Sequence, residues 1–300
     1  MKSVGFLLIL LLPFTYLSAQ EDTSSLLSSI EGGDSGPNYT TASFKSNRII
    51  NLHSIENTAP GVLDFTISHR FGSVKNGVYD IFGLDAAQMR LGFDFGLSDR
   101  LAVGVGRSNN QKIIDGYAKY KVLRQRNPKG EMPVSLSVVL GMGISTQRFS
   151  DPNRNNLFSS RLYYNSQLLL ARKFSEGFTL QLTPTWIHRN LVATSAETND
   201  VIAFGVGARQ KITKRLSLNA EFIYVLPDQL GSQYTNSASI GVDIETGGHV
   251  FQLHFTNSQG MNEKTFVTET SDKWSDFAVH FGFNLSRVFT LWSPAGASQW

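Results

Sequence analysis

One histidine, one threonine and two glutamates near the C-terminus are the residues whose types and spacing come closest to a catalytic group. His254 and Thr256 are separated by one residue, so in a strand both side chains point to the same face. Glu263 and Glu269 follow in the next loop. A histidine that activates a hydroxyl, oriented by a carboxylate, is the arrangement of a nucleophilic hydrolase. Threonine in place of serine weakens this candidate.

A second histidine, His280, could form a metal-binding or haem-binding site together with His254. His254 and His280 lie three and four residues from the outer ends of two neighbouring predicted strands, so we expect them to face each other across one rung. Paired imidazoles can bind a metal or haem. Hydrogen bonding to neighbouring groups is the simpler expectation, and we therefore predict no metal, no cofactor and no catalytic residue.

In many segments of the chain, apolar and polar residues alternate, and the charged side chains lie mostly at the polar positions. We call these positions the polar phase. Inside a barrel, such charges either pair and close the lumen, or line water and select solutes. Glycine is also frequent in this phase, which leaves room for water, a solute or a segment of chain. The predicted lumen-lining residues are Asp64, Arg70, Arg90, Asp94, Asp115, Lys119, Lys121, Arg209, Lys211, Glu221, Asp243, Glu245, His254 and His280.

The segments that position these residues are strands. Between Val134 and Ser145, every even position is large and apolar, whereas the odd positions are small or polar except Val139. A period of two over this length predicts a strand that suits the roughly 9 to 11 residues needed to cross a bilayer. The pattern recurs to give twelve strands, which begin near Val62, Gln88 and Leu101 and then occupy residues 112–124, 134–146, 161–173, 178–189, 201–212, 215–226, 237–246, 249–257 and 276–289.

Connection lengths support a membrane barrel. Outer-membrane barrels alternate short periplasmic turns with longer extracellular loops. Residues 98–99, 175–177, 213–214 and 247–248 are short connections, and they alternate with long ones at residues 72–87, 147–160, 190–200, 227–236 and 258–273. Residues 109–111 and 125–133 depart from this alternation. An even number of strands places both ends of the barrel in the periplasm.

The apolar phase separates a membrane barrel from a secreted β-sandwich. This phase is almost free of charge, and aromatic residues such as Tyr120, Phe174, Tyr164 and Trp186 gather near strand ends, as interfacial girdles do. A sandwich would instead expose the polar phase, which carries too few lysines for that role. The predicted fold class is all-β, a transmembrane antiparallel up-and-down β-barrel of about 12 strands with a short N-terminal periplasmic or plug segment.

Composition and the N-terminus define the remaining parts. The chain has no cysteine, so disulfides and thiolate chemistry are excluded, and its net charge of +3 is too small to indicate nucleic-acid binding. Residues 1–20 are typical of a signal peptide. Residues 21–61 are predicted to be a periplasmic leader with a plug segment at residues 42–54, residues 62–291 the barrel, and residues 292–300 a C-terminal tail. The plug candidates are Lys45, Arg48 and His53.

Six short motifs are distributed along the chain: Phe44-Lys45-Ser46, Arg48-Ile49-Ile50-Asn51, Ile67-Ser68-His69-Arg70-Phe71-Gly72, Phe82-Gly83-Leu84-Asp85, Gly104-Val105-Gly106-Arg107-Ser108 and Phe255-Thr256-Asn257. With these motifs the chain resembles a family of outer-membrane β-barrels of unknown function from Bacteroidota-type bacteria. The resemblance covers nearly all of the chain after the signal peptide. It implies the barrel fold and an outer-membrane location, but no activity and no catalytic residue.

The function predicted from the sequence is a narrow, porin-like pore or solute-specific channel in the bacterial outer membrane. The expected partners are outer-membrane lipid, the barrel insertion machinery and a small polar solute. A non-conducting barrel that serves as an interaction or assembly protein is the alternative. An outer-membrane lipid hydrolase is a remote alternative. The spacing of His254 and Thr256 resembles that of a lipid A deacylase, but the alternation of the strand turns both side chains toward the lumen and away from lipid.

Overall fold

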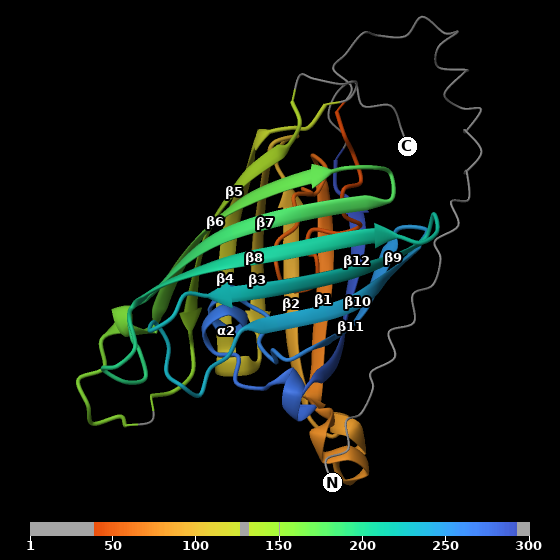
Figure 1. The fold of residues 1–300 in the computed structure, drawn as a ribbon. Coiled ribbons are helices and arrows are strands. Elements are labelled where there is room, and N and C mark those ends of the chain that lie inside the picture. Colours follow the sequence, from red (N-terminus) through yellow and green to blue (C-terminus); the bar gives the residue numbers. More distant parts are fainter. Residues whose placement is uncertain (1–38, 127–131, 150, 293–300) are drawn as a thin grey trace, which may run out of the picture. The chain divides into compact units, whose positions relative to one another are not determined.

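The computed structural model describes residues 39–126, 132–149 and 151–292. Within these ranges, twelve antiparallel strands form a closed barrel in which each strand pairs with the next and β12 pairs with β1 (Figure 1). The predicted all-β barrel is therefore confirmed. The strands are β1 (Val62–Ser73), β2 (Ala87–Gly96), β3 (Leu101–Ser108), β4 (Ile113–Leu123), β5 (Ser135–Ser145), β6 (Leu162–Lys173), β7 (Phe178–Arg189), β8 (Asp200–Lys211), β9 (Leu216–Val225), β10 (Ser237–Thr246), β11 (His249–Thr256) and β12 (His280–Thr290).

Helical turns occur in the connections. The last strand begins at His280, later than the residue 276 expected from the alternation, because a 3₁₀ turn precedes it and Phe277 has a φ of 55°. The described ranges contain no helix that is long and apolar enough to cross a membrane. The helical elements are η1 (Val74–Gly83), η2 (Asn110–Lys112), η3 (Phe158–Arg161), α2 (Glu263–Thr268) and η4 (Trp274–Asp276).

Alternation along each strand separates an apolar outer face from a polar inner face. In β7, for example, Thr179, Gln181 and Thr183 are buried, while Phe178 and Leu182 are exposed. A face of exposed leucine and phenylalanine around a closed barrel suits hydrocarbon. The outer face is therefore the surface that contacts lipid.

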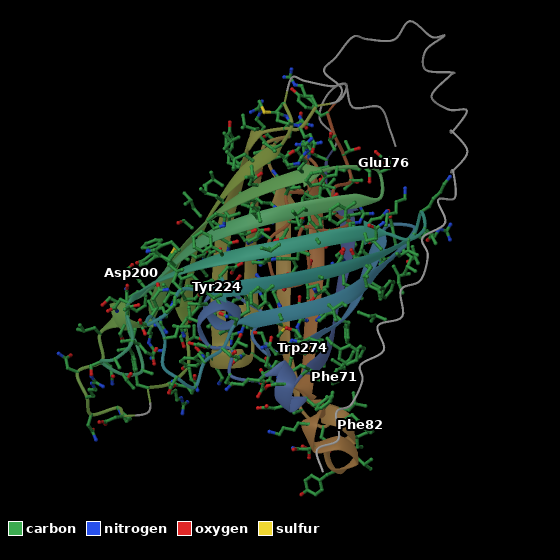
Figure 2. All side chains as sticks on the ribbon, in the orientation of Figure 1. Phe71, Phe82, Glu176, Asp200, Tyr224 and Trp274 are labelled. Carbon is green, nitrogen blue, oxygen red and sulfur yellow. The ribbon has the colours of Figure 1, made fainter. Side chains whose placement is uncertain are left out.

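The two ends of the barrel differ in their connections. Short turns such as the one that contains Glu176 lie at one end, and the longer loops that contain Phe82 and Trp274 lie at the other (Figure 2). Because periplasmic turns are short in such barrels, the end at Glu176 is periplasmic and the end at Trp274 is extracellular.

Two chain segments fill the inside of the barrel. We call residues 39–61, which precede β1, the inner segment, and residues 257–279, which include α2, the inner loop. Their buried apolar side chains meet apolar residues that point inward from the strands. This inner core contains Phe44, Ile49, Leu52, Ile55, Val139, Leu169, Ala171, Ile187, Ala203, Ile223, Phe266 and Val267.

Candidate functional site: a filled lumen

The inner segment folds back on itself as a tight turn inside the barrel. Ser54 donates its backbone N–H to the carbonyl of Asn47 at 2.9 Å, and the Ile49 N–H donates to the Leu52 carbonyl at 2.8 Å. Arg48 and His53 form an isolated bridge between the two arms. The turn therefore presents residues 49–52 as its tip.

The tip is held by a carboxylate from the barrel wall. Glu221, in the centre of β9, accepts hydrogen bonds from the backbone N–H groups of Ile50 at 3.2 Å, Asn51 at 2.9 Å and Leu52 at 3.1 Å. Consecutive N–H groups of a turn form a concave anion site of this kind. The tip thus receives a charged acceptor that its own backbone does not provide.

The carbonyl groups of the inner segment are also satisfied by side chains of the wall. Because a buried carbonyl without a donor is costly, these bonds are needed for the segment to remain inside the barrel. They join Gln252 Nε2 to the Ile49 carbonyl at 2.9 Å, Asn284 Nδ2 to that of Ile50 at 3.1 Å, Gln181 Nε2 to that of His53 at 2.7 Å, Lys119 Nζ to that of Ser54 at 3.3 Å and Arg209 Nη1 to that of Ala42 at 2.9 Å.

Glycines of the wall make room for the tip. A Cβ atom added at Gly207 would lie 2.3 Å from Ile49 Cδ1, and one added at Gly205 would lie 2.8 Å from Leu52 Cδ1. Other inward glycines admit wall side chains, such as Arg90 over Gly106. The space left by these glycines is therefore occupied by protein.

The inner loop meets the inner segment through one carboxylate. Glu263, the first residue of α2, lies 2.7 Å from Arg48 Nη1 and 3.1 Å from His53 Nε2. Phe266 and Val267 of α2 are buried in the inner core. The segment that enters from the periplasmic end and the loop that enters from the extracellular end therefore share an ionic contact inside the lumen.

The ionisation of this contact depends on burial. Burial and the Arg48 guanidinium lower the pKa of His53 from 6.5 to about 3, despite the neighbouring Glu263. Burial alone would raise the pKa of Glu263, but Arg48 and His53 lower it well below its usual range. Inside the barrel, His53 is thus neutral and Glu263 is ionised over the physiological pH range.

This contact predicts that the packing of the inner segment depends on pH. A displaced inner segment binds a proton on His53 below pH 6.5, whereas the packed one does not, so the packed state is fully favoured above that pH and loses stability as pH falls toward about 3. At pH 5 the loss is roughly 2 kcal/mol, or about thirtyfold in the ratio of displaced to packed states. After correction for intrinsic exchange rates, amide hydrogen exchange of residues 49–52 should be faster at pH 5 than at pH 7.5, and His53→Gln should remove the difference. Equal exchange of the unmodified protein at both values would contradict this assignment.

The structure places most of the predicted lumen-lining residues in buried positions inside the barrel. Asp64, Arg70, Arg90, Asp94, Asp115, Lys119, Arg209, Glu221, Asp243, His254 and His280 are buried. Lys121, Lys211 and Glu245 are partly exposed near the periplasmic end.

Some of these residues are brought together and others contact the inner segment. Arg90 Nε donates to Asp115 Oδ1 at 3.0 Å, which makes a buried ion pair between β2 and β4. Arg70 donates to Asn51 Oδ1 at 3.1 Å. Of the predicted plug residues, Arg48 and His53 contact Glu263, and Lys45 forms an ion pair with Glu245.

The expected pairing of His254 with His280 is wrong. The register of β11 and β12 places Thr256 opposite His280 and Gly282 opposite His254. His280 contacts Asp272 at 2.7 Å, and within the described ranges no cluster of three metal-ligating side chains occurs. The prediction failed because β12 begins later than expected, which shifts the register.

The hydrolase candidate is not assembled. His254 and Thr256 both point into the barrel and are buried, away from the lipid-facing surface. Thr256 Oγ1 accepts a hydrogen bond from Ser239 Oγ at 2.8 Å. Glu263 contacts Arg48 and Glu269 contacts Lys264, so neither of these carboxylates orients His254.

Sequence reasoning missed the inner core and the inner loop. Val139 interrupts an otherwise polar phase, and the structure shows that it packs inside the barrel, as do Leu169 and Ile223. These inward apolar residues were the available signal for a buried chain segment. Glu263 carried no such signal, because its loop shows no alternation and its partners lie 210 and 215 positions earlier in the chain.

Open space remains at the two ends of the barrel. Cavities of about 520 Å³ and 310 Å³ lie at the extracellular end, where both are lined by Gln111, Arg189 and Lys264. A cavity of about 380 Å³, lined in part by Lys45 and Glu245, lies at the periplasmic end. The inner core and the contact of Glu263 with Arg48 lie inside the barrel.

Solved structures with similar architecture include two outer-membrane proteins. The first is the KdgM porin, with 8% identity, a TM-score of 0.45, and coverage of 76% of this chain and 99% of the porin. The second is an outer membrane channel from Pseudomonas putida F1, with 12% identity, a TM-score of 0.45, and coverage of 78% of this chain and 97% of the channel.

The family of the chain is shown by its sequence. No curated protein matches the chain in sequence. Residues 44–289 match the family model described as a membrane bound beta barrel domain, DUF5777. The match spans all but the first five residues of the inner segment and all but the last residue of the barrel. A barrel that spans a membrane with alternating short turns and long loops is an outer-membrane protein. The chain therefore belongs to the DUF5777 family of membrane-bound β-barrels.

Proposed function

We propose that this protein is a narrow outer-membrane channel in its closed state, and that the inner segment is a plug whose displacement opens the lumen. The observation that carries the proposal is the chemistry of the wall around the inner segment. Glu221, Gln181 and Asn284 satisfy the backbone of the segment, and the same side chains can be hydrated when the segment leaves. The polar wall therefore suits both a packed segment and a water-filled lumen.

The attachment of the segment also suits reversible displacement. Among the described residues, the inner segment contacts the wall mainly through side chains, and its backbone hydrogen bonds to the backbone of the barrel lie at its two ends. Thr40 N–H donates to the Gln125 carbonyl and Gly61 N–H donates to the Gly96 carbonyl, each at 2.9 Å. The strand ladder closes without the segment. The barrel can therefore retain its hydrogen bonds while the segment moves.

Planar-bilayer recording of the refolded protein tests the proposal. We expect the intact barrel to be mostly closed with brief openings, and a barrel without residues 43–58 to conduct steadily. Silence from both proteins, each shown to be folded by heat-modifiable gel mobility, would overturn the channel function.

A non-conducting barrel with an interacting loop is the second candidate. Its support is η1, in which Val78, Tyr79 and Phe82 are exposed, Tyr79 at 90%. Phe82 lies at the extracellular end of the barrel (Figure 2). Exposed apolar side chains beyond the membrane suit a contact with another protein. This candidate gains support if the intact and the shortened barrels are both silent.

A further inference from the structure

The two extracellular cavities are parts of one hollow in the mouth of the barrel. They have volumes of about 520 Å³ and 310 Å³ and share the residues Gln111, Arg189, Leu191 and Lys264. Together they are within the size range of sites for small organic molecules. Arg189 lies at the end of β7 and faces inward, with 3% of its surface exposed, so the hollow belongs to the lumen and a solute reaches it from outside the cell.

The charges around the hollow do not balance. Among the described residues, Glu197 pairs with Arg189 at 3.0 Å and Glu269 pairs with Lys264 at 2.6 Å. Asp272 lines only the larger cavity and contacts His280 at 2.7 Å, which is an ion pair only when that histidine is protonated. Arg148 and Arg161 line the smaller cavity, and neither forms an ion pair with a carboxylate of the described residues. The smaller cavity therefore carries uncompensated positive charge.

The position of Arg161 is fixed before any ligand arrives. Its Nη1 donates to the carbonyl of Ser145 at 2.9 Å and to that of Gln147, and its guanidinium lies 3.8 Å from the centre of the Phe149 ring. These contacts orient the group without neutralising it. Arg189 adds a buried Nε atom that has no hydrogen-bond partner among the described residues. A guanidinium held in this way binds carboxylate or phosphate with little loss of side-chain entropy.

The larger cavity offers neutral polar groups instead. Its lining includes side-chain amides, hydroxyls and a phenol that come from η2 and from the loops after β9 and β11. These residues are Asn110, Asn257, Gln259, Tyr234, Thr270 and Ser271. Neutral donors and acceptors in this density suit the hydroxyl groups of a sugar.

We propose that this hollow is the outer binding site for a hydroxylated organic anion, a sugar ring that carries a carboxylate or a phosphate. The anionic group binds at Arg148 and Arg161, and the hydroxyl groups bind in the larger cavity. Lys264 lines both cavities, and the preceding residue, Glu263, contacts Arg48 of the inner segment. The role of the site in uptake rests on the proposed channel function, whereas the binding itself does not.

Binding is measured by calorimetry on the refolded full-length protein in detergent, with glucuronate, glucose 6-phosphate and glucose as ligands. We expect glucuronate or glucose 6-phosphate to bind at least about tenfold more tightly than glucose, with an affinity that falls as salt rises. The preference between these two anions identifies carboxylate or phosphate as the group recognised. Arg148→Ala and Arg161→Ala should each weaken binding of the anion by about tenfold to a hundredfold.

Arg154→Ala is the matched control, because Arg154 lies in the same loop but lines neither cavity. It should leave the affinity unchanged. Equal affinity for glucose and both anions, absence of binding by all three, or equal losses from Arg154→Ala and Arg161→Ala would overturn the proposal. Anion binding by a barrel that never conducts would support the site and overturn the channel function, so the two failures are distinguishable.

Discussion

Deletion of residues 43–58 is expected to turn a mostly closed barrel into a steadily conducting one. The deletion removes Phe44, Ile49, Leu52 and Ile55 from the inner core. It also leaves Glu221 and the other polar groups that held the segment facing the lumen, where water takes the place of the segment's backbone. Planar-bilayer recording at constant salt measures the change as conductance and open time.

The barrel should survive this deletion, because every strand retains both of its neighbours. A second protein that lacks residues 22–37, an equal number of residues, controls for the shortening of the chain and should behave like the intact protein. Silence from a folded barrel that lacks residues 43–58 would mean that the inner segment does not control conduction.

The substitution Glu221→Ala is expected to have the largest effect of any single change. It removes the acceptor of the Ile50, Asn51 and Leu52 amides. A buried donor without a partner costs about 1–3 kcal/mol, so the packed state of the segment should lose roughly 3 kcal/mol or more. That corresponds to more than about a hundredfold in the ratio of open to closed states. The open probability in single-channel recordings gives this ratio directly.

Glu245→Ala is the comparison for this substitution. Glu245 also contacts the inner segment, through Lys45, but its side chain is 44% exposed. An exposed ion pair contributes about 0–1 kcal/mol, so the open probability should change little. Equal effects of the two substitutions would mean that the amide contacts of Glu221 do not hold the segment.

The barrel was predictable because its signal is local. A period of two identifies each strand and its two faces from neighbouring residues alone, as in β5, and the alternation of short and long connections orders the strands. The same phase identified the buried positions of Arg70, Glu221 and Asp243. The pairing of β1 with β12 was also predictable, because an unpaired strand edge would leave backbone N–H and C=O groups without partners in the lipid.

The arrangement inside the lumen was not predictable in the same way. Residues 42–54 have no clear period, and their partners are wall residues such as Gln181, Glu221 and Asn284, far away in the sequence. Periodicity assigns a side chain to a face but does not say what it contacts. The positions of Arg48 and His53 beside Glu263 depend on how two irregular segments meet, which only the folded chain determines.

The most direct test of the closed channel is a reversible link between the inner segment and the wall. The chain contains no cysteine, so the pair Ile49→Cys and Gly207→Cys gives one defined disulfide where the Ile49 side chain meets β8. Each single substitution serves as a control that cannot form an intramolecular bond.

Single-channel recording of this pair, before and after addition of a reductant, is the measurement. We predict no openings in the oxidised protein and a return of openings after reduction, while the single-cysteine proteins open in both conditions. The same conductance in the oxidised and reduced protein, with the disulfide verified by mass, would contradict the account, because solute would then pass a segment that cannot move.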